Sequence, residues 1–313
     1  MQIIDLHCDT ILKLWEENGV ANLRQNLFSV DVEKLVNAGS LAQFFAIFVD
    51  RQEHTKSYSA FEAMAAVFFK ELAKNTDRLA LARSADELEN NQGTGKISCF
   101  LTIEEGGVLE GSMENLRAAY QLGVRLITLT WNYPNEIGFP NNEWRYQHDG
   151  LTPFGQDVIC EMNRLGMLID VSHLSDQGFF DVARLSKQPF VASHSNARAI
   201  TGHSRNLTDD MIKMIADQGG VIGLNFCSEF LGASEISRVE DMVRHVLHIM
   251  KVGGREVIAL GTDFDGINPK LEIEHIGQIG GLISALEQAG LTENELEKFC
   301  WQNSFRVIHD VMG

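Results

Sequence analysis

The first apolar segment of the chain is Ile3-Ile4-Asp5-Leu6-His7-Cys8-Asp9-Thr10. Its sequence distinguishes between two possible α/β folds. It begins with β-branched residues, as expected for a strand buried on both faces. An open doubly wound sheet normally follows its first strand with a glycine-rich nucleotide loop. The residues His7-Cys8-Asp9-Thr10 contain no glycine, so the start of the chain favours a closed barrel over an open nucleotide-binding sheet.

Short apolar segments recur along the rest of the chain, with helical patterns between most of them. The predicted strands are Ile3 to Leu6, Leu41 to Val49, Ile97 to Ile103, Val124 to Thr130, Met167 to Val171, Phe190 to Ala192, Val221 to Asn225 and Val257 to Leu260. The predicted helices are Tyr58 to Asn75, Met113 to Leu122, Phe154 to Leu165, one starting after Ser175, Met211 to Gln218, Ser237 to Val252 and Thr292 to Val311. This alternation predicts a parallel sheet. We therefore expect an α/β fold with a single (β/α)8 barrel domain over residues 1–313 and extra helices at the C-terminus.

Composition excludes several classes of function. The chain has 313 residues, of which 44% are hydrophobic and 22% are charged, as in an ordinary globular protein. Its formal net charge of −17 argues against binding to nucleic acid or to an anionic membrane surface. Five scattered cysteines without a Cys-x-x-Cys pattern argue against a disulfide framework or a zinc–thiolate site. With the first strand at residue 3 and no apolar run of membrane-spanning length, we expect a cytoplasmic protein.

Metal-binding residue types recur just after the predicted strands. They are His7 and Asp9, Glu104 and Glu105, His173, His194, and Asp263 and Asp265. In a (β/α)8 barrel the C-terminal ends of all strands meet at one face, where active sites lie. Imidazole and carboxylate ligands suit zinc or a similar divalent ion, and a bridging carboxylate can hold two ions.

Some of these residues also fit ordinary structural roles. Glu104 and Glu105 point to opposite faces if the strand persists, so at most one of them enters the barrel mouth. Asp265 precedes Gly266 and is expected to cap a turn, and Asp263 has the same alternative. Arg205 precedes a helix and either binds a substrate carboxylate or forms a salt bridge within its loop.

In the combination and order of these motifs, the chain resembles the membrane dipeptidase (renal dipeptidase) family, zinc peptidases of the amidohydrolase superfamily. The matching segments are Asp5 to Thr10, Glu105-Gly106-Gly107, Leu126 to Asn132, Gly166 to Ser175, Ser193 to Ala197, Ser204-Arg205-Asn206 and Gly261 to Gly266. The resemblance implies two Zn²⁺ ions, or similar divalent ions, per chain. His7 and Asp9 would bind one ion, and His173 and His194 would bind the other. Glu105, preferred to Glu104 because of the Glu-Gly-Gly match, would bridge the two ions together with a water or hydroxide.

The same resemblance implies roles for three further residues. Asp263 would be the general acid and base, and Arg205 would bind the C-terminal carboxylate of the substrate. The chain departs from the family pattern at Trp131, because mammalian family members have a substrate-contacting histidine at this position. A tryptophan can pack against a substrate side chain and donate one N–H, but it cannot shuttle a proton.

These residues together predict a metal-dependent dipeptidase in which a bridging hydroxide attacks the peptide bond of short free dipeptides. The resemblance implies that L-Xaa-D-Xaa dipeptides are among the substrates. Two alternatives remain: another hydrolase on the same metal site, such as a lactonase, deaminase or phosphotriesterase-like enzyme, and a barrel whose metals support only structure or binding. The secretion signal and lipid anchor of mammalian members are not found in the sequence, so no membrane partner is expected. A homodimer is suggested only by analogy with other barrel enzymes.

Overall fold

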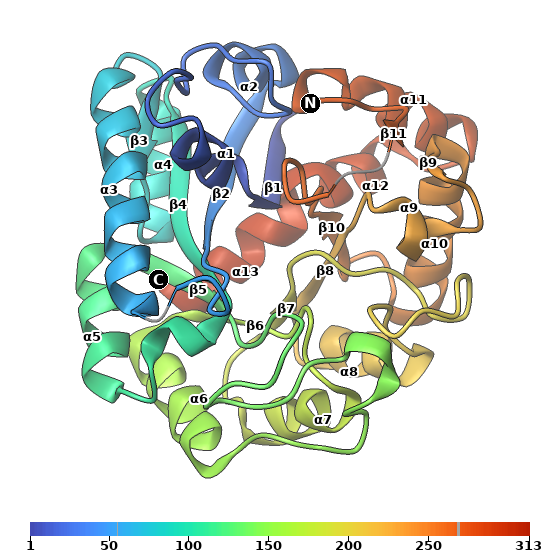
Figure 1. Cartoon of the computed structure of the whole chain (residues 1–313). Coiled ribbons are helices and arrows are strands. Elements are labelled where there is room, and N and C mark those ends of the chain that lie inside the picture. The colour runs from blue at the N-terminus through green and yellow to red at the C-terminus, as the bar shows by residue number, and fades with distance from the viewer. Residues whose placement is uncertain (55, 268–269) are drawn as a thin grey trace.

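The computed structural model describes residues 1–54, 56–267 and 270–313 and consists of a parallel barrel surrounded by helices (Figure 1). In order around the barrel, the strands are β1 (Ile3–Cys8), β2 (Ser40–Phe48), β4 (Ile97–Glu104), β5 (Val124–Thr128), β6 (Leu168–Asp170), β7 (Val191–Ala192), β8 (Val221–Leu224) and β10 (Ile258–Leu260). The sheet closes because β2 pairs with β4 as well as with β1, and both pairings are parallel. Each strand overlaps one of the predicted apolar segments, so the predicted (β/α)8 barrel is confirmed.

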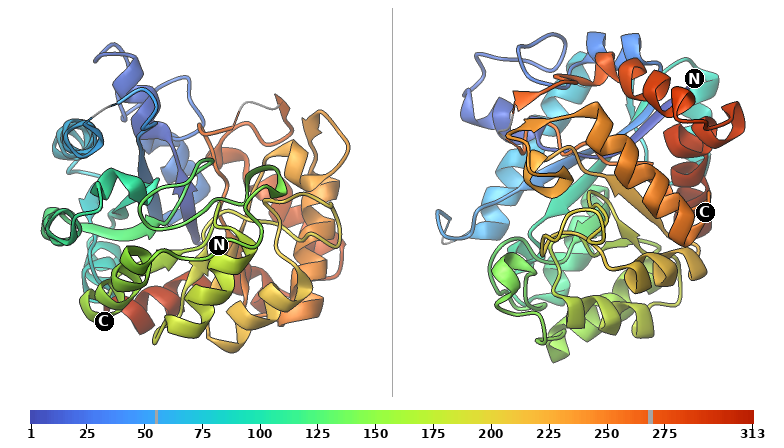
Figure 2. Two further views of the ribbon diagram at one scale, coloured as in Figure 1. Left: turned by 60° about the horizontal axis from the view of Figure 1, so that its bottom comes forward. Right: turned by 90° about the vertical axis from the view of Figure 1, so that its right-hand side faces the viewer.

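Helices cover the outside of the barrel, as Figures 1 and 2 show. They are α1 (Thr10–Glu16), α2 (Val32–Ala38), α3 (Ser57–Lys74), α4 (Ala85–Gly93), α5 (Met113–Leu122), α6 (Pro153–Leu165), α7 (Asp176–Leu185), α8 (Asp209–Asp217), α9 (Ser228–Leu231), α10 (Val239–Gly253), α11 (Gly280–Gln288), α12 (Glu293–Glu297) and α13 (Asn303–Met312). The side chains of Thr152 and Thr208 accept hydrogen bonds from the backbone of the first turns of α6 and α8, so these helices begin where capping residues predict.

Several elements differ from the prediction. The long C-terminal helix is divided into α12, a π-helical segment at Lys298–Gln302 and α13. The helices α1, α2, α4, α9 and α11 and the short strands β3 (Leu79–Leu81), β9 (Ile236–Ser237) and β11 (Lys270–Leu271) were not among the predicted elements. β3 extends the barrel sheet along β4, whereas β9 and β11 pair separately.

One end of the barrel is closed by the C-terminal helix. Ile4, Phe44 and Phe100 belong to an apolar cluster inside the barrel, and Ile308 and Val311 of α13 belong to the same cluster. Figure 1 shows α13 crossing behind the strands. The barrel interior is therefore filled at this end, and the C-terminal ends of the strands form the open mouth. Among the described residues, no helix combines the length and the hydropathy needed to span a membrane.

Candidate metal centre and active site

Glu104 lies between two pairs of metal-binding side chains at the mouth of the barrel. Its Oε2 atom is 3.3 Å from His7 Nε2, and His7 Nε2 is also 3.3 Å from Asp9 Oδ2. Its Oε1 atom is 3.1 Å from His173 Nε2 and 3.7 Å from His194 Nε2. One carboxylate therefore presents one oxygen to each pair.

A bulge in β1 brings His7 to this position. Asp5 pairs with Gln43 and Cys8 pairs with Phe45, so β1 has one more residue than β2 between these two points. Leu6 belongs to the cluster inside the barrel, whereas Cys8 belongs to the cluster outside it. The extra residue allows His7 to follow Leu6 into the mouth instead of alternating away from it.

Strand alternation places Glu104, and not Glu105, at the site. Cys99, Leu101 and Ile103 lie in the outer core, whereas Phe100 lies inside the barrel. Glu104 shares the inward direction of Phe100 because it is four residues further along the same strand. Glu105 follows the end of β4 with a φ of +74°, and no metal-competent group includes it among the described residues. The choice of Glu105 as the bridging residue, made on the Glu-Gly-Gly match, is therefore corrected to Glu104.

The central side chains lack hydrogen-bond partners although they are buried. Neither ring nitrogen of His7 and neither carboxylate oxygen of Asp9 has a partner among the described residues. A Cβ atom at Gly266 would lie 2.2 Å from Asp9 Oδ2, so a glycine is needed beside this carboxylate. An unsatisfied buried polar atom costs about 1–3 kcal/mol, and a cation held by one ring nitrogen of His7 and by the Asp9 carboxylate would satisfy up to three of the four at once.

The two remaining histidines also fit a cation. His173 Nδ1 lies 3.1 Å from Asn132 Oδ1, and His194 Nδ1 lies 2.7 Å from the Ser193 hydroxyl. Because Asn132 Oδ1 is an acceptor, and because the Ser193 hydroxyl donates its hydrogen to Asp170, both rings are assigned with the proton on Nδ1. The two Nε2 lone pairs then face each other at 3.0 Å. Without a cation the two lone pairs repel each other. A zinc or similar divalent ion bound between them would remove this repulsion.

Burial and charge set the protonation of the cluster. Burial lowers the pKa of His173 and of His194 well below the usual value, which favours the neutral form that binds metals. Burial acts in the same direction on His7, but the Glu104 and Asp9 carboxylates outweigh it and raise the pKa of His7 well above its usual value. Burial, with the nearby Asp9 charge, raises the pKa of Glu104 to about 8. Glu104 is thus placed to retain a proton at neutral pH when no cation compensates the negative charge around it.

Asp170, at the end of β6, fixes the histidine pair from behind. Its Oδ1 accepts hydrogen bonds from the backbone N–H groups of Ser172 and Ser193, and its Oδ2 accepts from the hydroxyls of Thr128 and Ser193. Such outer contacts orient metal-binding histidines. Asp170 was not among the predicted site residues, although a carboxylate at the end of a buried strand was a detectable signal.

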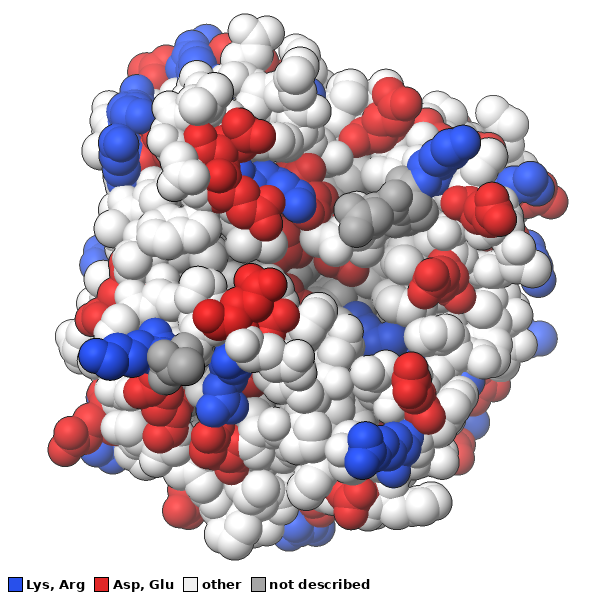
Figure 3. Space-filling model, viewed as in Figure 1, with Lys and Arg blue, Asp and Glu red and all other residues white. Residues whose placement is uncertain are grey.

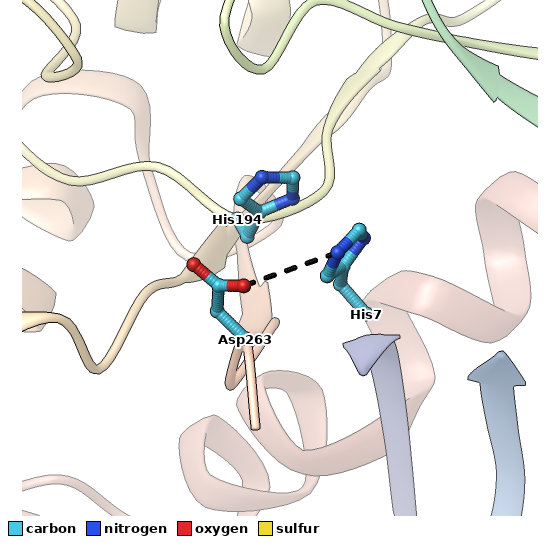
Figure 4. A group of neighbouring side chains, drawn as sticks. All are labelled: His7, His194 and Asp263. Atoms are coloured by element: carbon cyan, nitrogen blue, oxygen red, sulfur yellow. Dashed lines mark ion pairs between the residues drawn. The ribbon is translucent and has the colours of Figure 1, made fainter. Parts of the chain in front are cut away.

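Asp263 stands at the edge of the cluster. Figure 4 shows His7, His194 and Asp263 pointing toward one another from β1, the loop after β7 and the loop after β10. Asp263 Oδ1 is 3.9 Å from His7 Nε2, and Asp263 Oδ2 accepts a hydrogen bond of 2.8 Å from Asn225. Burial raises the pKa of Asp263 to about 6. Asp265 instead accepts hydrogen bonds from Thr10 and from the backbone of Ser29, which is a structural role.

Arg205 lies behind the wall of the site. It is 4% exposed, its Nη2 donates to the carbonyl of His194 at 3.3 Å, and its guanidinium carbon is 5.1 Å from the ring centroid of Phe230. Its Nε and Nη1 atoms have no partner among the described residues. Two buried donors therefore remain available near Asp263 and Glu104, whose negative charges partly offset the effect of burial, which lowers the pKa of this guanidinium.

A cavity of about 700 Å³ opens above the cluster. Its lining includes Asp9, Glu104, His173 and Asp263 at the cluster, Phe48 and Trp131 on one side, and Cys227 to Phe230 at the start of α9. Figure 3 looks into this hollow and shows acidic side chains around it. Phe230 lines the cavity, and its ring packs against the guanidinium of Arg205.

Comparison with known proteins identifies the family. A model of the membrane dipeptidase family (peptidase family M19) matches residues 1–312. The chain belongs to the membrane dipeptidase family. It is 31% identical over 316 residues to an uncharacterised dipeptidase of Schizosaccharomyces pombe (strain 972), and the match covers 93% of this chain and 73% of that protein. Membership in the family makes this protein a hydrolase that acts as a metal-dependent dipeptidase.

Two solved metallopeptidase structures have the same architecture over nearly their whole length. Dipeptidase AC, a metallopeptidase of family M19, superposes with a TM-score of 0.93 at 27% identity and covers 100% of this chain and 99% of its own. A metallopeptidase from Rhodobacter sphaeroides superposes with a TM-score of 0.90 at 26% identity over 99% of both chains. That structure holds a phosphinate mimic of the dipeptide L-Ala-D-Ala.

In this member of the membrane dipeptidase family, most of the predicted site residues meet. His7, Asp9, His173, His194 and Asp263 gather around Glu104. Arg205 is close behind them, Trp131 lies on the cavity wall, and Glu105 lies outside the cluster. Asn225, which directly follows β8 and donates a hydrogen bond to one oxygen of Asp263, was not among the predicted site residues either.

Proposed function

We propose that this protein binds two divalent ions, with Zn²⁺ the favoured metal, and uses them to hydrolyse short free dipeptides. His7 and Asp9 would hold one ion, His173 and His194 would hold the other, and Glu104 would offer one carboxylate oxygen to each. The observation that carries this proposal is that each oxygen of Glu104 faces one of the two pairs. When bound, such a pair of ions lowers the pKa of a water and polarises the carbonyl that the water attacks.

Asp263 is the residue placed to move protons during the reaction. Asn225 occupies its Oδ2 atom, so Oδ1 stays free on the side of His7. From this position Asp263 accepts a proton from the attacking water and delivers it to the departing amine of the substrate. Trp131 cannot take this part because its indole only donates a hydrogen bond.

Arg205 binds the carboxylate of the substrate's C-terminal residue. Its unpartnered Nε and Nη1 atoms are two donors of one planar group, and a guanidinium binds a carboxylate most strongly through two such bonds. Because a longer peptide would carry its carboxylate beyond this point, the contact restricts the enzyme to dipeptides. The L-Ala-D-Ala mimic held by the related Rhodobacter sphaeroides enzyme supports L-Xaa-D-Xaa dipeptides as substrates here as well.

A hydrolysis panel tests the proposal directly. Purified protein is assayed with Zn²⁺, and after chelation, on L,L and L,D dipeptides, their C-terminal amides and tripeptides, while bound metal is measured by elemental analysis. We expect about two metal ions per chain, loss of activity on chelation, and faster release of amino acids from free dipeptides than from the amides or tripeptides. Metal-loaded protein that cleaves none of the dipeptides would overturn the function, and equal rates on free and amidated dipeptides would overturn the role of Arg205.

A further inference from the structure

We infer that the aromatic wall formed by Phe48 and Trp131 binds the side chain of the substrate's N-terminal residue, and that Glu105 positions this wall. The inference rests on the proposed dipeptidase function and names its preferred substrates as dipeptides with an apolar or aromatic N-terminal residue.

The order of strands in the barrel sets the direction of the substrate. Arg205 belongs to the loop after β7, and Phe48 ends β2, which lies four strands from β7 in either direction around the ring. A dipeptide whose carboxylate points to Arg205 and whose peptide bond lies over Glu104 therefore extends its N-terminal residue toward the β2 side of the mouth. Phe48 and Trp131 are the aromatic residues on that side of the cavity.

The aromatic wall faces the site and is open to it. Phe48 pairs in register with Glu104 on the neighbouring parallel strand, so the two side chains point to the same face. The ring centroids of Phe48 and Trp131 are 4.7 Å apart with an interplanar angle of 58°. Both rings line the cavity and neither residue is fully buried, so each offers apolar surface for a ligand side chain to cover.

Tyr133 ties the two parts of the wall together. Its ring packs edge-on against Trp131 at a centroid distance of 5.6 Å. Its hydroxyl accepts a hydrogen bond from the backbone N–H of Arg51 and donates one to Asp50, in the segment that directly follows Phe48 and Val49. The loop that carries Trp131 and the end of β2 are thus joined into one surface, which lowers the entropy cost of binding a side chain.

Glu105 holds the same loop from below. Its carboxylate accepts hydrogen bonds from the backbone N–H of Trp131 at 2.8 Å, from the side chain of Asn135 at 2.7 Å and from the backbone N–H of Gly107 at 2.8 Å. A Cβ atom at Gly107 would lie 2.2 Å from Glu105 Oε1, so the glycine is required for this close approach. Glu105 touches neither the central cluster nor the cavity and acts on the substrate only through Trp131.

The test compares two substrate series in three variants. Leu-Ala against Gly-Ala reports on the N-terminal residue, and Ala-Leu against Ala-Gly reports on the C-terminal residue. Phe48→Ala and Trp131→Ala remove the wall, and Trp144→Ala is the matched control because Trp144 stacks on Arg198 and is 42% exposed. We expect the wild-type preference for Leu-Ala over Gly-Ala in kcat/KM to be about tenfold or more. That ratio should fall about tenfold in both wall variants, mainly through KM, and stay within about twofold of wild type in Trp144→Ala.

The outcomes separate this inference from the function on which it rests. Equal losses in both substrate series, or a wild type that discriminates only at the C-terminal residue, would overturn the wall while leaving the dipeptidase intact. Hydrolysis of neither series by metal-loaded protein would overturn both. If an alanine variant does not fold, Phe48→Leu and Trp131→Leu keep apolar volume and should shift the preference from aromatic toward aliphatic N-terminal residues, and an unchanged preference would contradict the wall.

Glu105→Gln tests the positioning role separately. Glutamine keeps one acceptor oxygen but turns an N–H₂ group toward a donor, so the loop should shift and the KM for Leu-Ala should rise about three- to tenfold with kcat and metal content unchanged. Glu105→Gln should change the tryptophan fluorescence spectrum relative to wild type. The same substitution made in Trp131→Phe should leave the spectrum of Trp131→Phe unchanged. The KM effects of Glu105→Gln and Trp131→Ala should also be non-additive, because one acts through the other. Additive effects, or an unchanged spectrum, would refute this role.

Discussion

Two sets of buried polar side chains meet at the mouth of this barrel and differ in how they are satisfied. In the central set, His7 and Asp9 have no hydrogen-bond partner among the described residues although both are buried. In the surrounding set, Asp5, Glu105 and Asp170 are buried too, but each accepts three or four hydrogen bonds from its neighbours. The two sets occupy the same end of the same strands.

The difference in hydrogen bonding distinguishes residues that hold the structure from residues that are candidate metal ligands. Folded proteins satisfy nearly all of their buried polar groups, so a saturated carboxylate such as that of Asp170 is part of the framework. A group of unsatisfied ligand atoms within a few ångströms marks the place that an ion fills. Glu104 and Glu105 are neighbours in sequence and fall on opposite sides of this division.

Exchanging each glutamate for glutamine is the strongest test of the division. Glu104→Gln removes the charge shared by the two metal pairs, so most of the bound metal should be lost and kcat/KM should fall by more than about 100-fold, the upper end of the effect of losing an outer contact. Glu105→Gln should keep its metal, because its carboxylate accepts hydrogen bonds from the loop around Trp131 and from the backbone of Gly107 and belongs to no metal-competent group among the described residues. Elemental analysis and dipeptide hydrolysis measure both quantities on the same samples. Loss of metal from Glu105→Gln with retention in Glu104→Gln would restore the bridging role to Glu105.

The barrel and most of the candidate site could be predicted from sequence because both depend on local signals. Buried parallel strands read as short apolar runs, and ligand types at their ends stand out even when they are distant in the chain. The short helices α1 and α2 lie between β1 and β2 and were not predicted, because their apolar residues cover too few turns to give a helical period.

The identity of the bridging glutamate could not be decided in the same way. Phe100 and Leu101 are both apolar, so the sequence of β4 does not tell which of the alternating faces is inside the barrel. The inward direction of Glu104 follows from pairing with β2 and β5, where it lies in register with Phe48 and Thr128. Pairing over such sequence distances has no local signal. The contacts of Asn225 with Asp263 and of Asp170 with Ser193 are hidden for the same reason.

Asp263→Asn tests whether a residue at the edge of the central set works without holding metal. The amide keeps the size of the side chain but cannot accept the proton of the attacking water, so kcat should fall about 100-fold while metal content stays near the wild-type value. Asn225 provides the matched control: Asn225→Ala frees Asp263 Oδ2 without removing the carboxylate, and it should cost less. Near-normal turnover in Asp263→Asn would show that another group moves the proton.

Asp170→Asn tests how strongly the hydrogen bonds of the surrounding set contribute to metal affinity. The amide can no longer accept all four hydrogen bonds, so Ser193 and with it the ring of His194 should lose their fixed orientation. We expect metal affinity to fall about 10- to 100-fold with the fold retained, measured by competition with a chelator of known affinity and by circular dichroism. Unchanged affinity would mean that the orientation of His194 is set by its own packing.

The smallest effect on the site is expected from replacing His245. It is a buried histidine whose two ring nitrogens already have hydrogen-bond partners. Its Nδ1 accepts a hydrogen bond from the backbone N–H of Ala197, and its Nε2 donates to the carbonyl of Leu231. Burial lowers its pKa from 6.5 to about 4. A depressed histidine pKa favours the neutral form in the folded state, so this stabilisation is complete above pH 6.5 and is lost as the pH falls from 6.5 toward 4.

The loss amounts to about 2 kcal/mol at pH 5, from 1.36 kcal/mol for each unit of pKa shift. Urea unfolding gives the free energy of unfolding at pH 7.5 and at pH 5. The decrease between the two pH values should be smaller by this amount in His245→Gln than in wild type. The control is His309→Gln, because the His309 side chain is 66% exposed and its replacement should leave the difference unchanged. Turnover at pH 7.5 should change little in either variant, because neither histidine lines the cavity. A large loss of metal in His245→Gln would mean that a fully satisfied imidazole also supports the site, and the division between framework and ligand would then fail for histidines.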